Sequence, residues 1–130
     1  MIEQTELVVS KWQYQPPVNG IEDENKLTGY ISLDVKKKRA ATKKGIACRF
    51  SCEYIYEKEL ILEFIAEDSY VIDLEDIIDK NELQTMLRNS YSKFKDKYDF
   101  RKLGTVLQEI PLMGFDEKKY DLDPILLLLE

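Results

Sequence analysis

The chain has 130 residues, of which 44% are hydrophobic and 34% charged, and its formal net charge is −6 at pH 7. A chain of this length fits one domain over residues 1–130, which can bury a core without a disulfide or a metal. The acidic balance disfavours nucleic acid as a partner, because nucleic-acid binding usually leaves a basic footprint.

No membrane or export signal is apparent in the sequence. Residues 1–10 lack the basic and apolar regions of a signal peptide. The longest apolar run, residues 125–129, is far shorter than the ~20 residues that a membrane-spanning helix needs. We therefore expect a cytoplasmic protein that does not insert into a membrane.

Two cysteines and no histidine limit the chemistry that the chain can perform. Cys48 and Cys52 fall on one predicted strand face with their Cα atoms about 13 Å apart, too far for a disulfide. Buried free thiols are the simplest interpretation. Zinc needs three or four ligands, and no glycine-rich phosphate loop is present, so we expect no metal, no cofactor and no enzymatic activity.

The first predicted strand spans residues 5–14 and ends at a proline pair, since proline cannot donate to the hydrogen-bond ladder. Strict alternation places Trp12 and Tyr14 on one face and Leu7 and Val9 on the other. Both faces are therefore expected to be partly buried, or an aromatic rim is open to a partner.

A polar connection over residues 18–26 leads to the second predicted strand, which alternates from Leu27 to Val35. A predicted basic loop follows over residues 36–44. The simplest interpretation is a solvated hairpin tip, with an acidic partner surface or nucleic acid as alternatives, because lysines neutralise phosphates without reading sequence. Its cations, the candidates for contact with an anionic partner, are Lys36, Lys37, Lys38, Arg39, Lys43 and Lys44.

The stretch 45–74 predicts a long antiparallel hairpin at the centre of the sheet, with a charged turn at residues 57–59. Alternation gives each arm one buried face and one mostly wet face. The first arm buries Ile46, Cys48, Phe50, Cys52, Tyr54 and Tyr56. The second buries Leu60, Leu62, Phe64 and Ala66, and then Tyr70, Ile72 and Leu74.

Beyond residue 74 the apolar period becomes helical and predicts a helix over residues 81–98, capped by Asp79 or Asn81. This helix should lie on the apolar face of the sheet. Residues 99–108 extend it or form a second short helix that Pro111 ends. A last helix begins at Asp123 with a proline in its first turn. The apolar stripe of the long helix is Leu83, Met86, Leu87, Tyr91, Phe94 and Tyr98.

Three carboxylate pairs, Glu67-Asp68, Glu75-Asp76 and Asp121 with Asp123, are interpreted as capping and solubilising groups. Acid–base work would require burial that separates the two pKa values of a pair.

Aromatic residues and a leucine-rich tail are the candidates for protein contact. Tyrosine and tryptophan are enriched at protein interfaces, although core or rim packing is the plainer interpretation. The tail cannot bury five consecutive apolar residues on one helix face, so it is either wedged between elements or contacts a second subunit. The candidate partner surface is Trp12, Tyr14, Tyr54, Tyr56 and Phe64, and the candidate oligomer contact is Ile125, Leu126, Leu128 and Leu129.

Three stretches of the chain resemble the SecB-like fold family, which comprises the export chaperone SecB and small SecB-related proteins. The resemblance is to the family's second strand in KLTGYISLDV, to its central strand pair in CRFSCEYIYEKELILEFI, and to its post-helical segment in LQEIPLMGFD. The resemblance implies an α+β fold with a four-stranded antiparallel sheet and C-terminal helices packed on one face. It also implies a homo-oligomer, dimer or tetramer, that binds a protein or unfolded polypeptide without ATP.

The chain departs from the export chaperones at two places. Its helix lacks their aromatic-proline-tyrosine start, and no acidic tail follows the last helix, so docking to the export motor is not implied. The expected function is a non-catalytic SecB-like chaperone or adaptor that holds a polypeptide on apolar and aromatic surface. The alternative is binding of nucleic acid or another anionic partner through residues 36–44.

Overall fold

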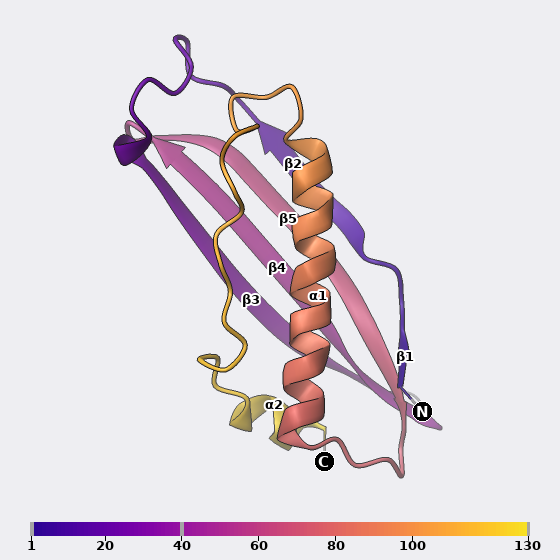
Figure 1. The fold of residues 1–130 in the computed structure, drawn as a ribbon. Helices are drawn as coiled ribbons and strands as arrows, with labels where there is room; N and C mark the ends of the chain where they lie inside the picture. The colour runs from indigo at the N-terminus through magenta and orange to yellow at the C-terminus, as the bar shows by residue number, and fades with distance from the viewer. Residues whose placement is uncertain (1, 40, 130) are drawn as a thin grey trace.

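The computed structural model describes residues 2–39 and 41–129 (Figure 1). Its elements follow in the order β1 (Ile2–Gln4), β2 (Val8–Tyr14), a 3-10 turn (Glu24–Lys26), β3 (Leu27–Arg39), β4 (Lys43–Tyr56), β5 (Glu59–Asp73), α1 (Lys80–Arg101) and α2 (Asp123–Leu128).

The strands form one antiparallel sheet in the order β1-β5-β4-β3, and β2 pairs with β5 as well. Because β1 and β2 lie along the same edge of β5, the sheet is four strands wide. Both helices lie on one face of this sheet (Figure 1). The predicted α+β class, with a four-stranded antiparallel sheet and a helix packed on it, is confirmed.

The first strand differs from its prediction in two ways. It begins at Val8 rather than at residue 5, after the buried side chain of Leu7 and a separate short strand β1, and its register with β5 shifts between Val9 and Lys11. Such a bulge adds one residue and exchanges the faces beyond it. Leu7 and Val9 therefore pack into the same core as Trp12 and Tyr14, which corrects the prediction that they lie on opposite faces.

The central hairpin forms as predicted, from β4 and β5. Glu57 and Lys58 have φ of 49° and 70°, the positive values that a tight two-residue hairpin turn requires. A register shift between Tyr54 and Ile55 leaves Leu60 40% exposed, which corrects its predicted inward position, and Ile61 is buried in its place. The six predicted inward positions of β4 are buried.

Gly45 lies where the backbone of β5 leaves no room for a side chain on β4. A Cβ atom at this position would lie 2.3 Å from the backbone oxygen of Tyr70. A side chain there would force the two strands apart, so glycine is needed for the pairing to continue to the end of β4.

The basic stretch 36–44 was expected to be a loop, and this expectation is wrong. Strand β3 runs on to Arg39 and β4 begins at Lys43, with Lys37 opposite Ile46 and Arg39 opposite Lys44. Cross-strand pairing overrides the weak strand propensity of lysine, whose charge is itself typical of edge strands. Alternation places Lys37, Arg39 and Lys44 on the helix-covered face and Lys36, Lys38 and Lys43 on the opposite face.

Helix α1 begins one residue before the predicted start and extends three residues beyond the predicted end. Of the two predicted caps, Asp79 is the one used, because its carboxylate accepts a hydrogen bond from the backbone N–H of Glu82 at 2.8 Å. Its buried stripe packs on the sheet through aromatic contacts. The Phe94 ring stacks on Phe64 with centroids 4.4 Å apart and on Phe50 with centroids 5.4 Å apart. These contacts fix the helix across the middle of β4 and β5.

After α1 the chain turns at residues 102–109 and runs back beside the helix, over β4 and β3, to α2 (Figure 1). Pro124 lies in the first turn of α2 as predicted, and the cap position is Leu122 rather than Asp123. Ile125 and Leu129 complete a second core cluster with Ile46 and Ile72.

Candidate functional site

Residues 110–116, here called the strap, have no regular secondary structure and cross the sheet beside α1 (Figure 1). Ile110 and Leu112 are buried in the aromatic core, while Pro111 between them is exposed. Met113 lies over β3, where its sulfur occupies the space that a side chain at Gly29 would take. The strap therefore occupies the space over the sheet beside α1.

Tyrosine hydroxyls hold the backbone of the strap. Tyr98 donates to the carbonyl of Ile110 at 2.9 Å, and Tyr54 donates to the carbonyl of Pro111 at 2.9 Å. Tyr91 donates to the carbonyl of Met113 at 2.5 Å. We call these three tyrosines the tyrosine cradle. Tyr91 and Tyr98 come from α1 and Tyr54 from β4, so the cradle spans the joint between helix and sheet.

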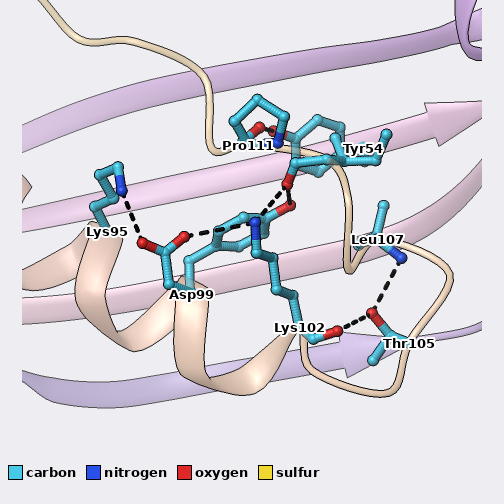
Figure 2. Close-up of polar contacts among 9 residues, drawn as sticks. Tyr54, Lys95, Asp99, Lys102, Thr105, Leu107 and Pro111 are labelled. Atoms are coloured by element: carbon cyan, nitrogen blue, oxygen red, sulfur yellow. Dashed lines mark hydrogen bonds and ion pairs between the residues drawn. The ribbon is translucent and has the colours of Figure 1, made fainter.

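Lys102 adds a fourth donor at the end of the cradle (Figure 2). Its ammonium donates to the carbonyl of Ile110 at 3.1 Å and lies 5.3 Å from the centre of the Tyr98 ring. Asp99 lies 3.7 Å from Lys102 and pairs with Lys95 at 2.7 Å. These surface ion pairs contribute little energy but orient the lysine toward the strap.

The turn that leads into the strap is closed by Thr105 (Figure 2). Its hydroxyl donates to the carbonyl of Lys102 at 2.6 Å and accepts from the backbone N–H of Leu107 at 3.1 Å. The Leu107 side chain is then fully buried. The chain is thus directed back over the sheet immediately after α1.

The cradle hydroxyls remain donors at physiological pH. Burial raises the pKa of Tyr54 to about 12 and also raises the pKa values of Tyr91 and Tyr98. Main-chain carbonyls are present in every residue, so the contacts that these hydroxyls make do not depend on the side chains of the segment that they hold. The arrangement can hold an extended polypeptide with little sequence preference.

The predicted aromatic partner surface needs correction. Tyr54, Tyr56 and Phe64 are buried in the chain's own core, and Trp12 and Tyr14 are half-buried beside it. The hydroxyl of Tyr56 accepts from the backbone N–H groups of residues 22 and 23, and that of Tyr14 accepts from the N–H of residue 106. Alternation correctly indicates burial at these positions, and rings of α1 pack against Trp12, Tyr54 and Phe64.

The cradle residues on α1 were not predicted as functional. Tyr91 and Tyr98 fit the apolar stripe of the helix, which hides what their hydroxyls do. The sequence does contain one indication of their function, which is that these positions hold tyrosine, with a hydroxyl, rather than a purely apolar residue. A core helix position that only needs volume takes leucine or phenylalanine, whereas a buried tyrosine requires a hydrogen-bond partner.

A buried carboxylate on β5 was also missed. Asp68 is 1% exposed and follows Ala66 on the inward face of the strand, so the prediction that it is a solubilising group is wrong. It accepts hydrogen bonds from the Gln4 amide at 2.7 Å and from the Ser90 hydroxyl at 2.9 Å. Burial is the main cause that raises the pKa of Asp68, although these hydrogen bonds oppose it.

Replacing Asp68 by asparagine is expected to change how stability depends on pH. The folded-state pKa of Asp68 lies above its ordinary value of 3.8, so ionisation weakens the folded state as pH rises through this interval. Asparagine cannot ionise. The free energy of unfolding of Asp68→Asn, minus that of the wild type, should therefore increase from pH 4 upward and then level off.

Urea unfolding at a series of pH values measures this difference. A constant offset at all pH values would reflect only the lost hydrogen bonds, and a difference that shrinks with rising pH would contradict the assignment of a raised pKa.

A groove near the start of α1 brings the basic stretch 36–44 and the leucine-rich tail together, through Lys44 and Leu126. It has a volume of about 500 Å³ and lies between α2, the connection from β5 to α1, and the start of β4. We call it the distal groove. It is lined by Lys44, Leu74, Glu75, Asp76, Ile77, Ile78, Leu126 and Leu129.

The residues of the leucine-rich tail, 125–129, differ in burial at this groove. Ile125 and Leu129 are buried in the core of the chain, as in a segment wedged between elements, so they are not available to a second subunit. Leu126 is half-buried, Leu128 is 38% exposed and Leu127 is 66% exposed. A helical period places the intervening leucines outward, so only part of the predicted oligomer contact is accessible.

The two cysteines are free and buried, and burial raises the pKa of each thiol to about 12. Within residues 2–39 and 41–129, no group of three or more cysteine, aspartate or glutamate side chains is placed to hold a metal ion. In the same part of the chain, no helix combines the length and hydrophobicity needed to cross a membrane.

No protein-family model matches the chain. No curated protein matches it by sequence comparison either.

Among solved structures, the chain is similar to the SecB-like chaperone Rv1957 of Mycobacterium tuberculosis, solved in complex with a ChAD peptide from the Rv1956 HigA1 antitoxin. The likeness covers 88% of each chain at 11% sequence identity with a TM-score of 0.52. A protein of unknown function from Streptococcus agalactiae is similar at 13% identity over 88% of this chain and 96% of that one, with a TM-score of 0.49. From its sheet order, its helix placement and the likeness to the mycobacterial protein, this chain has the SecB-like fold.

Proposed function

We propose that this protein is a non-catalytic polypeptide-binding module, a SecB-like chaperone or adaptor that holds an extended apolar segment of a partner on the tyrosine cradle. The observation that carries the proposal is the set of hydrogen bonds from Tyr54, Tyr91 and Tyr98 to three main-chain carbonyls of an extended segment. Backbone recognition of this kind suits a protein that binds many sequences.

The side chains of the strap indicate what such a segment supplies. Ile110 and Leu112 are buried in the same core cluster as Phe94 and Tyr98, whereas Pro111 is exposed. A partner segment with large apolar residues at alternate positions would bury comparable area, at about 25 cal/mol per Å² of apolar surface. The mycobacterial chaperone of the same fold, which was solved with a bound peptide, supports a polypeptide as the ligand.

In this proposal the strap competes with the partner for the cradle. The partner binds only the fraction of molecules in which the strap has left, so its apparent affinity is reduced by that fraction. Each tyrosine–carbonyl hydrogen bond contributes about 1 kcal/mol net, and the same donors become available to the incoming segment. Replacing the strap by a partner segment therefore costs less free energy than releasing the strap with nothing in its place.

We also propose that the protein acts in the cytoplasm and assembles into a homo-oligomer, a dimer or a tetramer. The exposed side chains of Leu127 and Leu128 support a contact between subunits at α2. Sedimentation at several protein concentrations measures the assembly, and a monomer at all concentrations would contradict it.

Polypeptide binding is tested by light scattering of a chemically unfolded, aggregating protein such as reduced lysozyme, without nucleotide. Scattering should decrease as this protein is added, until the two are in comparable molar amounts. The control is an equal mass of an unrelated folded protein. Unchanged aggregation in a molar excess of this protein would refute the proposed function.

A second candidate, binding of an anionic partner through residues 36–44, is supported by three cations. Within the described residues, Lys36, Lys37 and Arg39 form no ion pair. Lys38 and Lys43, by contrast, pair with Glu67 and Asp73.

A further inference from the structure

Lys44 is a buried cation whose ammonium forms one described hydrogen bond, to a backbone carbonyl. Its residue is 8% exposed, and its ammonium donates to the carbonyl of Asp76 at 2.7 Å. No described carboxylate forms an ion pair with it. An ammonium has three donors, and lysine is rarely this buried unless it is paired. Lys44 therefore has donors to spare for an anion.

This cation lines the distal groove, whose other walls are mainly apolar. Ile77 is 89% exposed at the groove, and Leu126 from α2 is half-buried there. A volume of about 500 Å³ accommodates several aliphatic side chains. Large exposed apolar residues around a concave surface are typical of a site that another molecule covers.

The neighbouring charges restrict the ligand further. Arg39 lies directly opposite Lys44 across the two strands and shares its face, so a second cation lies beside the first. Two acids, Glu75 and Asp76, also line the groove and would repel a run of negative charges. The charges therefore favour a single carboxylate with apolar neighbours over a polyanion.

We propose that the distal groove binds a polypeptide segment in which one carboxylate is flanked by large apolar side chains. The ammonium of Lys44 takes the carboxylate, and the flanking side chains pack between α2 and residues 74–78. This goes beyond binding at the tyrosine cradle, because it names a second surface at the other end of α1 and a partner of different chemistry.

The test uses the capped, fluorescently labelled peptide LLELL and its glutamine analogue LLQLL, with binding followed by fluorescence anisotropy. The wild type should bind LLELL at least about tenfold more tightly than LLQLL, since a hydrogen bond to a charged group contributes about 1.5–3 kcal/mol. Lys44→Met keeps an apolar side chain without the ammonium and should bind the two peptides equally. Lys36→Met, on the opposite face of the same hairpin, should keep the full difference.

Ile77→Ser tests the same groove without changing the buried Lys44. Because Ile77 is exposed, this substitution should not disturb folding. It should weaken both peptides and preserve their ratio. Equal binding of LLELL and LLQLL by the wild type would overturn the proposal. So would displacement of LLELL by a single-stranded RNA, which would make the cations a phosphate site.

The aggregation assay is run on the same variants, so that the two proposals fail separately. Peptide discrimination lost in Lys44→Met with aggregation suppression intact assigns the two activities to different surfaces, as proposed. If the wild type suppresses aggregation but binds LLELL and LLQLL equally, the distal groove proposal alone is refuted. If it distinguishes the two peptides but does not suppress aggregation, the tyrosine cradle proposal alone is refuted.

Discussion

Replacing Phe94 by alanine is expected to destabilise the protein by about 3–5 kcal/mol, a large part of the 5–15 kcal/mol that holds a domain together. The Phe94 side chain is fully buried, and its ring stacks on Phe64 at 4.4 Å and on Phe50 at 5.4 Å. Truncation removes both contacts and leaves a cavity between α1 and the sheet. Urea unfolding followed by circular dichroism measures the loss.

Phe100→Ala is the matched control, because Phe100 lies on the same helix and is 76% exposed. Its free energy of unfolding should change by no more than about 0.5 kcal/mol. Similar effects of the two substitutions, or a larger effect at Phe100, would show that α1 does not pack on the sheet through Phe94.

Replacing Leu112 by alanine is expected to strengthen the binding of an unfolded partner by about tenfold or more. Leu112 is 6% exposed in the strap, and truncation of a buried leucine costs about 2–5 kcal/mol. The variant weakens the strap but leaves every donor of the tyrosine cradle in place. Each 1.4 kcal/mol removed from the competing strap then increases the apparent affinity tenfold, up to the limit set by full release.

Anisotropy of a labelled unfolded protein measures this affinity, with far-ultraviolet circular dichroism to verify that the helix and sheet persist. Leu60→Ala is the control of the same residue type, because Leu60 is 40% exposed in β5 and lies outside both the strap and α2. Unchanged or weaker binding by Leu112→Ala in a folded protein would mean that the strap does not compete for the partner's site.

The central hairpin and α1 could be predicted from the sequence because their side-chain periods are regular. Each inward position of β4 from Ile46 to Tyr56 is apolar, and the helix repeats its apolar residues from Leu83 to Tyr98. The two bulges could not be predicted. One extra residue in β2 and another in β5 change which face a side chain occupies, and no residue type marks the change.

The basic stretch was misassigned for a different reason. Consecutive lysines resemble a solvated loop when only local propensity is considered, but pairing of Lys37 with Ile46 and of Arg39 with Lys44 continues the strands. Pairing with the neighbouring strand, rather than the local propensity of lysine, determined that these residues form strands. It also separated the six cations onto two faces, which is why only some of them lie near the distal groove.

The candidate site depends on long-range geometry that a single sequence does not contain. Tyr54 and Tyr98 appear in the sequence as core residues, and they are buried, but their function follows from the strap that returns over them. Asp68 could have been identified, because it continues the inward series between Ala66 and Tyr70. A charged residue in an otherwise apolar series indicates a buried polar network.

Photo-crosslinking tests most directly whether a polypeptide binds on the helix-covered face of the sheet. A benzoylphenylalanine is introduced at Tyr91, in the cradle, or at Tyr30, which is 56% exposed on the opposite face. An unfolded partner should form an adduct at position 91 and little or none at position 30. An adduct at position 30 with none at position 91 would contradict the proposed binding site.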